Sequence, residues 1–141
     1  FRSIEMQKSM DLFLENNQVV RNKWSWIPSV ENIYDYYNKS DVLVIPSFYE
    51  GLPLVLCEAM LSGCFVIASS VCDHPMIIGD NERGLLCDPT SPESICFSLE
   101  VLNKMDLNTR TSIINNARNY AYNHFNFDEM LRKYEELFPR A

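Results

Sequence analysis

Two short runs of apolar residues stand out in the hydrophobic pattern of the chain, Val42–Ile45 and Phe65–Ala68. Neither run alternates with polar residues, so each suits a parallel strand that is buried on both faces of a sheet. The residues between the two runs are numerous enough for a loop followed by a helix. The pattern therefore predicts a strand–loop–helix–strand unit, which is typical of α/β proteins.

Prolines and glycines divide the segment between the two expected strands. Pro46 and Gly51 mark a loop. Pro53 suits the first position of a helix, and Gly63 suits its end. The loop, residues 47–52, would then follow the carboxyl end of a strand and precede the amino terminus of a helix. Open α/β sheets bind their ligands at this place, so we expect a binding site there.

The rest of the chain continues the alternation of strand-like and helix-like segments. Val19–Trp26 is expected to form a strand, and Gly84–Asp88 a last short strand. Helices are expected at Ile4–Asn17, Ser29–Asn38, Pro92–Lys104, Asn108–Tyr122 and Phe127–Phe138. These elements predict an α/β fold with a doubly wound (Rossmann-like) parallel sheet, and residues 1–141 are enough for a single domain.

Two groups of apolar side chains outside the central unit are expected to pack in a core. Trp24 and Trp26 alternate with polar neighbours, as core residues of a half-buried strand do. The last expected helix carries one apolar stripe, which is typical of a packed amphipathic helix. The stripe consists of Met130, Leu131, Tyr134, Leu137 and Phe138.

Two glutamates lie between the expected central strands. Glu50 is in the loop, and Glu58 is the only charged residue of the stretch Leu52–Leu61. Helical periodicity puts Glu58 on a face with apolar neighbours, where a carboxylate is unfavourable to bury without partners. Spacing alone leaves two interpretations open. Glu58 is either a solvated residue at the rim of the helix or an acceptor for the hydroxyl groups of a ligand.

The full string from Pro46 to Ser69 narrows this choice. It reads P-S-x-x-E-G-x-P-x-x-x-x-E-A-M-x-x-G-x-x-V-I-A-S. This string closely resembles the donor-site signature, with its E-x7-E motif, of retaining GT-B glycosyltransferases of family 4 (glycosyl transferases group 1). A bare pair of glutamates at this spacing is common, whereas the full string in this context is specific. The resemblance covers nearly the whole chain and implies the C-terminal, donor-binding half-domain of a GT-B fold.

The resemblance also implies roles for individual residues. Glu58 would bind the ribose hydroxyls of a nucleotide-sugar, and Glu50 would lie against the sugar ring as the catalytic residue. Backbone N–H groups at a helix amino terminus suit the diphosphate, and those expected to donate belong to Gly51, Leu52, Leu54 and Val55. Backbone groups of the turn after the third strand of the family's sheet would contact the nucleotide base, here at Trp26, Ile27 and Pro28.

The chain departs from the family in the loop that follows Ser69. Cys72 and Asp73 replace a pair of glycines, and Met76 replaces a glutamate. Cys72, Asp73 and His74 are adjacent rather than spaced for one metal site. The resemblance implies metal-independent donor binding and no cofactor besides the donor substrate, and the absence of a D-x-D string fits this expectation.

Other parts of the family's donor site are expected upstream of this chain. An arginine and a lysine that hold the diphosphate would lie there, and Arg83 is a weak substitute for them. The first strands of the sheet and the amino-terminal domain that binds the acceptor are expected there as well. Without those strands Val42–Ile45 becomes a sheet edge. Either the expected strand Val19–Trp26 moves over and pairs with it, or two copies of the chain pair edge to edge; we expect the second outcome, a homodimer.

Composition limits the possible classes of protein. Hydrophobic residues make up 47% and charged residues 22%, as in soluble globular proteins, and no apolar run approaches the roughly 18 residues of a membrane span. Five scattered cysteines without a C-x-x-C pair favour a reduced, cytoplasmic setting. A formal net charge of −7 argues against a nucleic-acid partner.

These observations predict part of a retaining, hexosyltransferase-type glycosyltransferase of polysaccharide or glycoconjugate biosynthesis. It would transfer a sugar from a nucleotide-sugar to an acceptor held by the upstream domain, which is also where any association with a membrane surface is expected. The chain alone would be inactive. Two alternatives stay open, a non-catalytic or truncated nucleotide-sugar binding module and a GT-B nucleotide-sugar epimerase. No G-x-G-x-x-G is present, so a dinucleotide enzyme is not expected.

Overall fold

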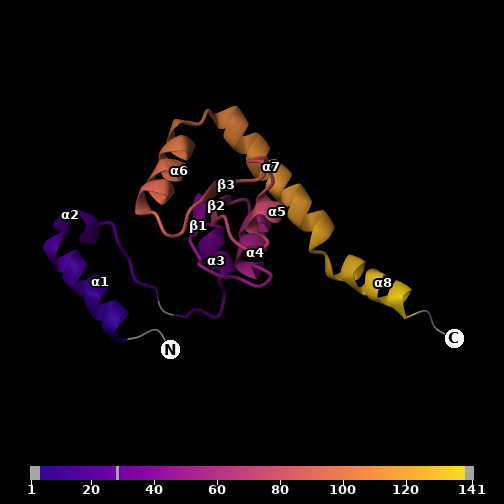
Figure 1. Cartoon of the computed structure of the whole chain (residues 1–141), viewed down its shortest axis with the longest axis horizontal. Coiled ribbons are helices and arrows are strands. Elements are labelled where there is room, and N and C mark those ends of the chain that lie inside the picture. Colours follow the sequence, from indigo (N-terminus) through magenta and orange to yellow (C-terminus); the bar gives the residue numbers. More distant parts are fainter. Residues whose placement is uncertain (1–3, 28, 139–141) are drawn as a thin grey trace. The chain divides into compact units, whose positions relative to one another are not determined.

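The computed structural model describes residues 4–27 and 29–138 of the chain (Figure 1). Contacts within the chain divide it into two compact units, Phe1–Glu31 and Asn32–Ala141. The first unit contains helices α1 (Ile4–Asn16) and α2 (Gln18–Arg21). The second unit contains a sheet and the remaining helices.

The first unit is helical where a strand was predicted. The prediction of a helix at Ile4–Asn17 is confirmed by α1, but the predicted strand Val19–Trp26 is wrong. The backbone N–H groups of Val20 and Arg21 both donate to the carbonyl of Asn17, at 3.0 Å each, so a local turn satisfies them. A strand needs a neighbouring strand whose backbone pairs with its N–H and C=O groups. The hydrogen bonds of a helical turn form within the segment itself and need no second strand.

The expected core packing of the two tryptophans is also absent. Trp24 and Trp26 are 45% and 54% exposed and lie in a segment without regular structure. Alternation with polar neighbours therefore does not mark a strand here. Trp24 instead lines an apolar cavity within the first unit.

The second unit is built on a parallel sheet of three strands in the order β1-β2-β3. The strands are β1 (Val42–Ile45), β2 (Phe65–Ser69) and β3 (Leu85–Cys87). Val42 pairs with Phe65, and Ile67 pairs with Leu85. All three segments were predicted as strands, and within the described residues β1 pairs only with β2, so it is an edge of this sheet.

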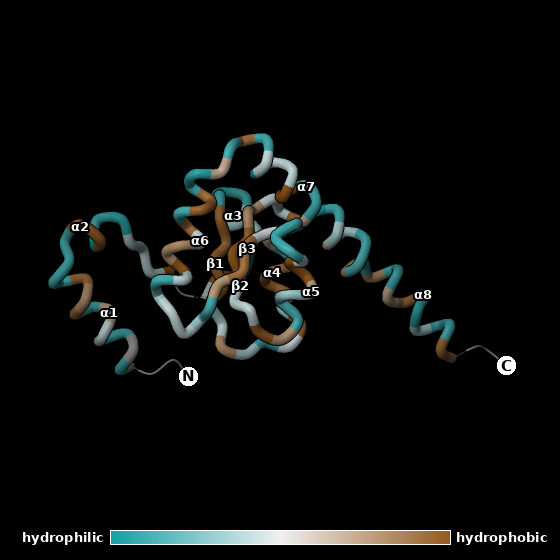
Figure 2. Tube along the Cα trace, turned by 45° about the horizontal axis from the view of Figure 1, so that its top comes forward, coloured by the Kyte–Doolittle hydropathy of each residue, from teal (hydrophilic) through white to brown (hydrophobic). Residues whose placement is uncertain are grey.

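Both faces of β2 are covered, which explains its unbroken apolar sequence. Val66 and Ala68 belong to one core cluster, while Phe65 and Ile67 belong to a second cluster on the other face. Every residue of β2 is buried. Figure 2 shows the strands as the most hydrophobic part of this unit, with more hydrophilic helices around them.

Helix α4 connects β1 to β2 and ends where the sequence indicated. It spans Leu54–Ser62, with Pro53 one position before its first residue, and Gly63 closes it with a φ of 84°. A Cβ at position 63 would lie 2.9 Å from Nη2 of Arg118. Arg118 donates through Nε to the carbonyl of Leu61 at 3.0 Å. Glycine at position 63 thus permits both the turn and this contact.

Two of the remaining helices differ from the prediction. The helix expected at Ser29–Asn38 is reduced to α3 (Tyr34–Tyr37), and Asn32, not Ser29, accepts a hydrogen bond from its first N–H group. The short helix α5 (His74–Ile78) was not predicted. The helices α6 (Pro92–Lys104), α7 (Leu107–His124) and α8 (Phe127–Leu137) confirm the three predicted at the carboxyl end.

The apolar stripe of α8 is not packed. None of the described side chains of this helix is buried, including Met130, Leu131 and Tyr134. The predicted core role of this stripe is therefore wrong in this structure. Helical periodicity shows which face of a helix is apolar, but it does not supply the surface that covers that face.

Candidate functional site

The loop from Pro46 to Pro53 links the carboxyl end of β1 to the first turn of α4, as expected (Figure 1). The parallel arrangement puts the carboxyl ends of β2 and β3 at the same edge of the sheet. Phe48 and Tyr49 in this loop are exposed. Ligands of open α/β sheets bind at such an edge.

Glu50 is half-buried in this loop and has one hydrogen-bond partner among the described side chains. Ser47 donates from Oγ to Oε1 of Glu50 at 2.7 Å. The other carboxylate oxygen, Oε2, has no partner in the described part of the chain. A hydroxyl that donates to one oxygen leaves the second oxygen free to accept from a ligand.

Glu58 lies on α4 at the boundary between core and surface. Its neighbours Leu56 and Met60 are buried, whereas Leu54 and Val55 are exposed. Glu58 is half-buried, so the structure supports neither a fully solvated glutamate nor a buried one.

Tyr37, on α3, is the protein partner of Glu58. The tyrosine hydroxyl donates to Oε2 of Glu58 at 3.2 Å, and the Tyr37 side chain is buried. Burial, followed by the nearby Glu58 carboxylate, raises the pKa of Tyr37 from 10.0 to about 12. The hydroxyl is therefore a neutral donor at neutral pH. Sequence reasoning missed this contact.

The backbone N–H groups expected to bind phosphate are mostly available. Those of Gly51, Leu52 and Val55 donate to no protein acceptor within residues 4–27 and 29–138. The N–H group of Leu54 instead donates to the carbonyl of Leu52 at 2.9 Å. The first turn of α4 thus presents free donors between the two glutamates in sequence, as a helix amino terminus does.

Gly51 has open space around its Cα. A Cβ at this position would meet no atom within 4 Å, and its φ lies outside the range that favours glycine. Neither the backbone conformation nor the surrounding protein therefore requires a glycine here. The absence of a side chain allows another molecule to approach the backbone closely.

The residues expected to contact a nucleotide base belong to the first unit. Trp26 and Ile27 are exposed, and their segment has no regular secondary structure. Pro28 lies outside the described residues. Their role stays a prediction.

Arg83 is engaged with α5. Its guanidinium donates to the carbonyl oxygens of Ile77, through Nε at 2.7 Å, and of Met76, through Nη2 at 3.1 Å. The same group lies 4.2 Å above the ring of Tyr120 on α7. Arg83 therefore satisfies the last carbonyls of a short helix and joins it to α7.

The loop that departs from the resembled family adopts a glycine-like conformation. Cys72 is exposed and has a φ of 48°, in the left-handed region. His74 is fully buried, and its Nδ1 lies 2.9 Å from the carbonyl oxygen of Ser69. Its Nε2 has no hydrogen-bond partner in the described structure.

Neither a metal cluster nor a candidate membrane span is found in the described residues. No group of three or more histidine, cysteine, aspartate or glutamate side chains there is arranged to hold a metal ion. No helix in this part of the chain is long and apolar enough to cross a membrane.

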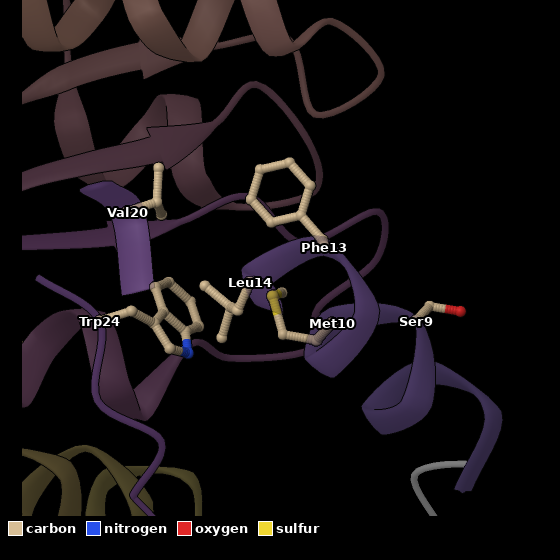
Figure 3. A pocket seen from close by; sticks show the side chains of 6 residues that line it. All are labelled: Ser9, Met10, Phe13, Leu14, Val20 and Trp24. Atoms are coloured by element: carbon tan, nitrogen blue, oxygen red, sulfur yellow. The ribbon is translucent and has the colours of Figure 1, made fainter. Parts of the chain in front are cut away.

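A separate apolar cavity of about 420 Å³ lies within the first unit (Figure 3). Figure 3 shows the side chains of α1, α2 and the following segment around it. They are Ser9, Met10, Phe13, Leu14, Val20 and Trp24. This lining contains no charged group and neither glutamate, so it does not share the chemistry of the loop before α4.

Comparison with known proteins identifies a family. The sequence profile described as "Glycosyl transferases group 1" matches residues 6–120. An uncharacterized glycosyltransferase of Methanocaldococcus jannaschii is 36% identical over 106 residues, which are 74% of this chain and 27% of that protein.

A second relative has a named activity. It is the GalNAc-α-(1→4)-GalNAc-α-(1→3)-diNAcBac-PP-undecaprenol α-1,4-N-acetyl-D-galactosaminyltransferase of Campylobacter jejuni, 38% identical over 98 residues. The match covers 68% of this chain and 27% of that enzyme. The chain thus spans about a quarter of the length of both relatives.

A solved structure confirms the predicted fold class. The C-terminal domain of a glycosyl transferase group 1 family protein from Francisella tularensis superposes with a TM-score of 0.74 at 28% identity. The match covers 89% of this chain and 65% of that one. The parallel α/β sheet is therefore that of a C-terminal half-domain of this kind.

Proposed function

The chain belongs to the group 1 glycosyltransferases, and on this premise we propose that it is the donor-binding part of an enzyme that transfers a sugar from a nucleotide-sugar to an acceptor. The pair of glutamates supports the proposal most directly. Glu50 and Glu58 each have one carboxylate oxygen held by a hydroxyl donor, and the other oxygen has no partner among the described residues. Free N–H groups lie between them in sequence.

Each of these groups has a part in the proposed donor complex. Glu58 accepts hydrogen bonds from the ribose hydroxyls, and the N–H groups of Gly51, Leu52 and Val55 donate to the diphosphate. No metal ion takes part in this binding.

Glu50 is the proposed catalytic residue. Its carboxylate faces the sugar ring and stabilises the positive charge that develops at the anomeric carbon as the bond to the diphosphate breaks. The new bond forms with retention of configuration. Ser47 holds one oxygen of Glu50 at 2.7 Å, which fixes the position of the negative charge.

A bound diphosphate needs positive charge from its site. The chain has a formal net charge of −7, and Arg83 is engaged with the carbonyls of α5. We expect cationic groups from the rest of the protein to complete the site. The isolated chain should then bind a nucleoside diphosphate weakly, on the order of millimolar, and transfer no sugar.

Calorimetric titration with uridine, guanosine and adenosine diphosphates tests donor binding by the chain. We expect weak binding of one diphosphate, which Glu58→Gln weakens further. Glu100→Gln is the matched control, since it neutralises an exposed glutamate on α6. Equal loss in both variants would contradict the assignment of Glu58. Tight binding would show that the chain needs no further cationic groups.

Product analysis with the full-length protein separates transfer from the alternatives. A new glycoside with release of nucleoside diphosphate supports the transferase. An epimerised nucleotide-sugar would support an epimerase instead. Donor binding without any product in the presence of acceptors would support a binding module.

A further inference from the structure

Tyr37 contacts Glu58 within the second unit, although the two residues are 21 positions apart. The Tyr37 side chain is only 5% exposed, so its hydroxyl has little access to water as an alternative partner. Its one hydrogen-bond acceptor among the described residues is Oε2 of Glu58, at 3.2 Å. The contact joins α3 to α4, the helix at the candidate donor site.

The tyrosine itself is held from two sides. Cys64 donates from Sγ to the carbonyl oxygen of Tyr37 at 3.2 Å. The ring of Tyr34 packs edge-on against that of Tyr37, with centroids 6.0 Å apart and planes at 81°. The hydroxyl therefore comes from a side chain with little freedom to move, so the position of the donor is well defined.

The two oxygens of the Glu58 carboxylate differ in their surroundings. Oε2 of Glu58 accepts from the tyrosine, while Oε1 has no partner within the described structure. A glutamate that is ordered before the ligand arrives loses less side-chain entropy on binding. The geometry of this hydrogen bond and the burial of Tyr37 together favour a role for Tyr37 beyond the stability of the fold.

We propose that Tyr37 is a positioning residue of the donor site, which holds Glu58 so that its second oxygen accepts from the ribose. The inference rests on the proposed function, in which Glu58 binds ribose hydroxyls. It adds that the selection of ribose depends on a hydroxyl group contributed by α3. Tyr34 and Tyr36 have no such role, because their hydroxyls make no hydrogen bond among the described residues.

The test measures discrimination between nucleotides as well as affinity. The chain is titrated with the nucleoside diphosphate that binds best and with its 2′,3′-dideoxy counterpart, which lacks both ribose hydroxyls. The wild type should prefer the ribose form. Tyr37→Phe should weaken binding of the ribose form about fivefold, ~1 kcal/mol, and change binding of the dideoxy form little.

Two variants of the same segment are matched controls. Tyr34→Phe and Tyr36→Phe also remove one phenolic hydroxyl, and both should keep the wild-type preference for ribose. Thermal unfolding of the three variants shows whether each one folds. If Tyr37→Phe lowers stability but keeps the preference for ribose, Tyr37 is only a structural residue and the inference is wrong.

Glu58→Gln distinguishes failure of the inference from failure of the proposed function. If Glu58→Gln removes the preference for ribose but Tyr37→Phe preserves it, the inference about Tyr37 is overturned and the proposed function is not. A wild type without any preference, or without diphosphate binding, overturns the ribose role of Glu58, and the role of Tyr37 falls with it. Loss of the preference in both variants supports the inference.

Discussion

Ser47 and Glu50 are joined by a hydrogen bond of 2.7 Å from Oγ to Oε1. Ser47 lies two positions after the last residue of β1, so the sheet fixes the position of this hydroxyl. Glu50 lies in the loop that leads to α4. The contact ties a loop carboxylate to the rigid part of the fold. If Glu50 is the catalytic residue, as proposed, this contact reduces the reordering that its carboxylate needs when the donor binds.

Removal of this hydroxyl should reduce turnover more than binding. In the full-length enzyme we expect Ser47→Ala to lower kcat about tenfold, with little change in the donor KM. Ser47→Thr, which keeps a hydroxyl, should restore most of the activity. Ser112→Ala, which removes an exposed hydroxyl on α7, is the control. An unchanged kcat for Ser47→Ala would show that the bond does not position Glu50.

The two glutamates should differ in their kinetic signatures. Glu58→Gln should raise the donor KM about tenfold with a smaller change in kcat, because ribose contacts change little during the reaction. Glu50→Gln should lower kcat about a hundredfold, since it removes charge stabilisation at the reacting centre. Steady-state kinetics of the full-length enzyme measure both. Effects confined to the donor KM in both variants would contradict the role of Glu50.

Gly51→Ala should affect the ligand and not the fold. The new Cβ meets no protein atom within 4 Å, so the free energy of unfolding should stay within about 0.5 kcal/mol of the wild type. Diphosphate binding should weaken because the Cβ occupies the approach to the backbone.

Gly84→Ala is the contrasting variant. Its Cβ would lie 2.6 Å from the carbonyl oxygen of Val66, at a φ of 156°, so it should destabilise the chain by more than about 2 kcal/mol. Urea unfolding and calorimetric titration measure the two effects. Unaltered diphosphate affinity in Gly51→Ala would argue against backbone contact with the ligand.

Stability at alkaline pH should depend on Tyr37. Burial, followed by the Glu58 carboxylate, raises its pKa from 10.0 to about 12 in the folded chain. As the pH rises, the unfolded chain therefore releases the Tyr37 proton before the folded chain does. The contribution of the protonated Tyr37 hydroxyl to stability is complete below pH 10 and is lost as the pH rises to about 12. Between these values wild type should lose more stability than Tyr37→Phe in urea unfolding. Identical losses would show that Tyr37 does not titrate in this way.

The edge strand should make the chain associate. β1 pairs only with β2 among the described strands, and Val42–Ile45 contains neither a charge nor a proline to protect the open side. Light scattering should show a mass that rises with concentration. A monomer at every concentration would contradict the prediction.

The sequence by itself determined the elements whose cause is local. α6 was predicted to the residue, because Ser91 accepts from the N–H group of Ser94 and Pro92 begins the helix. The strands β1 and β2 followed from unbroken apolar runs, and the end of α4 followed from Gly63. The string from Pro46 to Ser69 also indicated the family and the candidate site residues.

Only the tertiary structure decided which of these groups contact one another. The donor to Glu58 comes from Tyr37 on another helix, and Arg83 is engaged with the carbonyls of α5 and the ring of Tyr120. The apolar pattern of Val19–Trp26 produced no strand. The physical reason is that periodicity records which side of a segment is apolar, whereas pairing, capping by distant side chains and burial depend on a second segment that the local sequence does not specify.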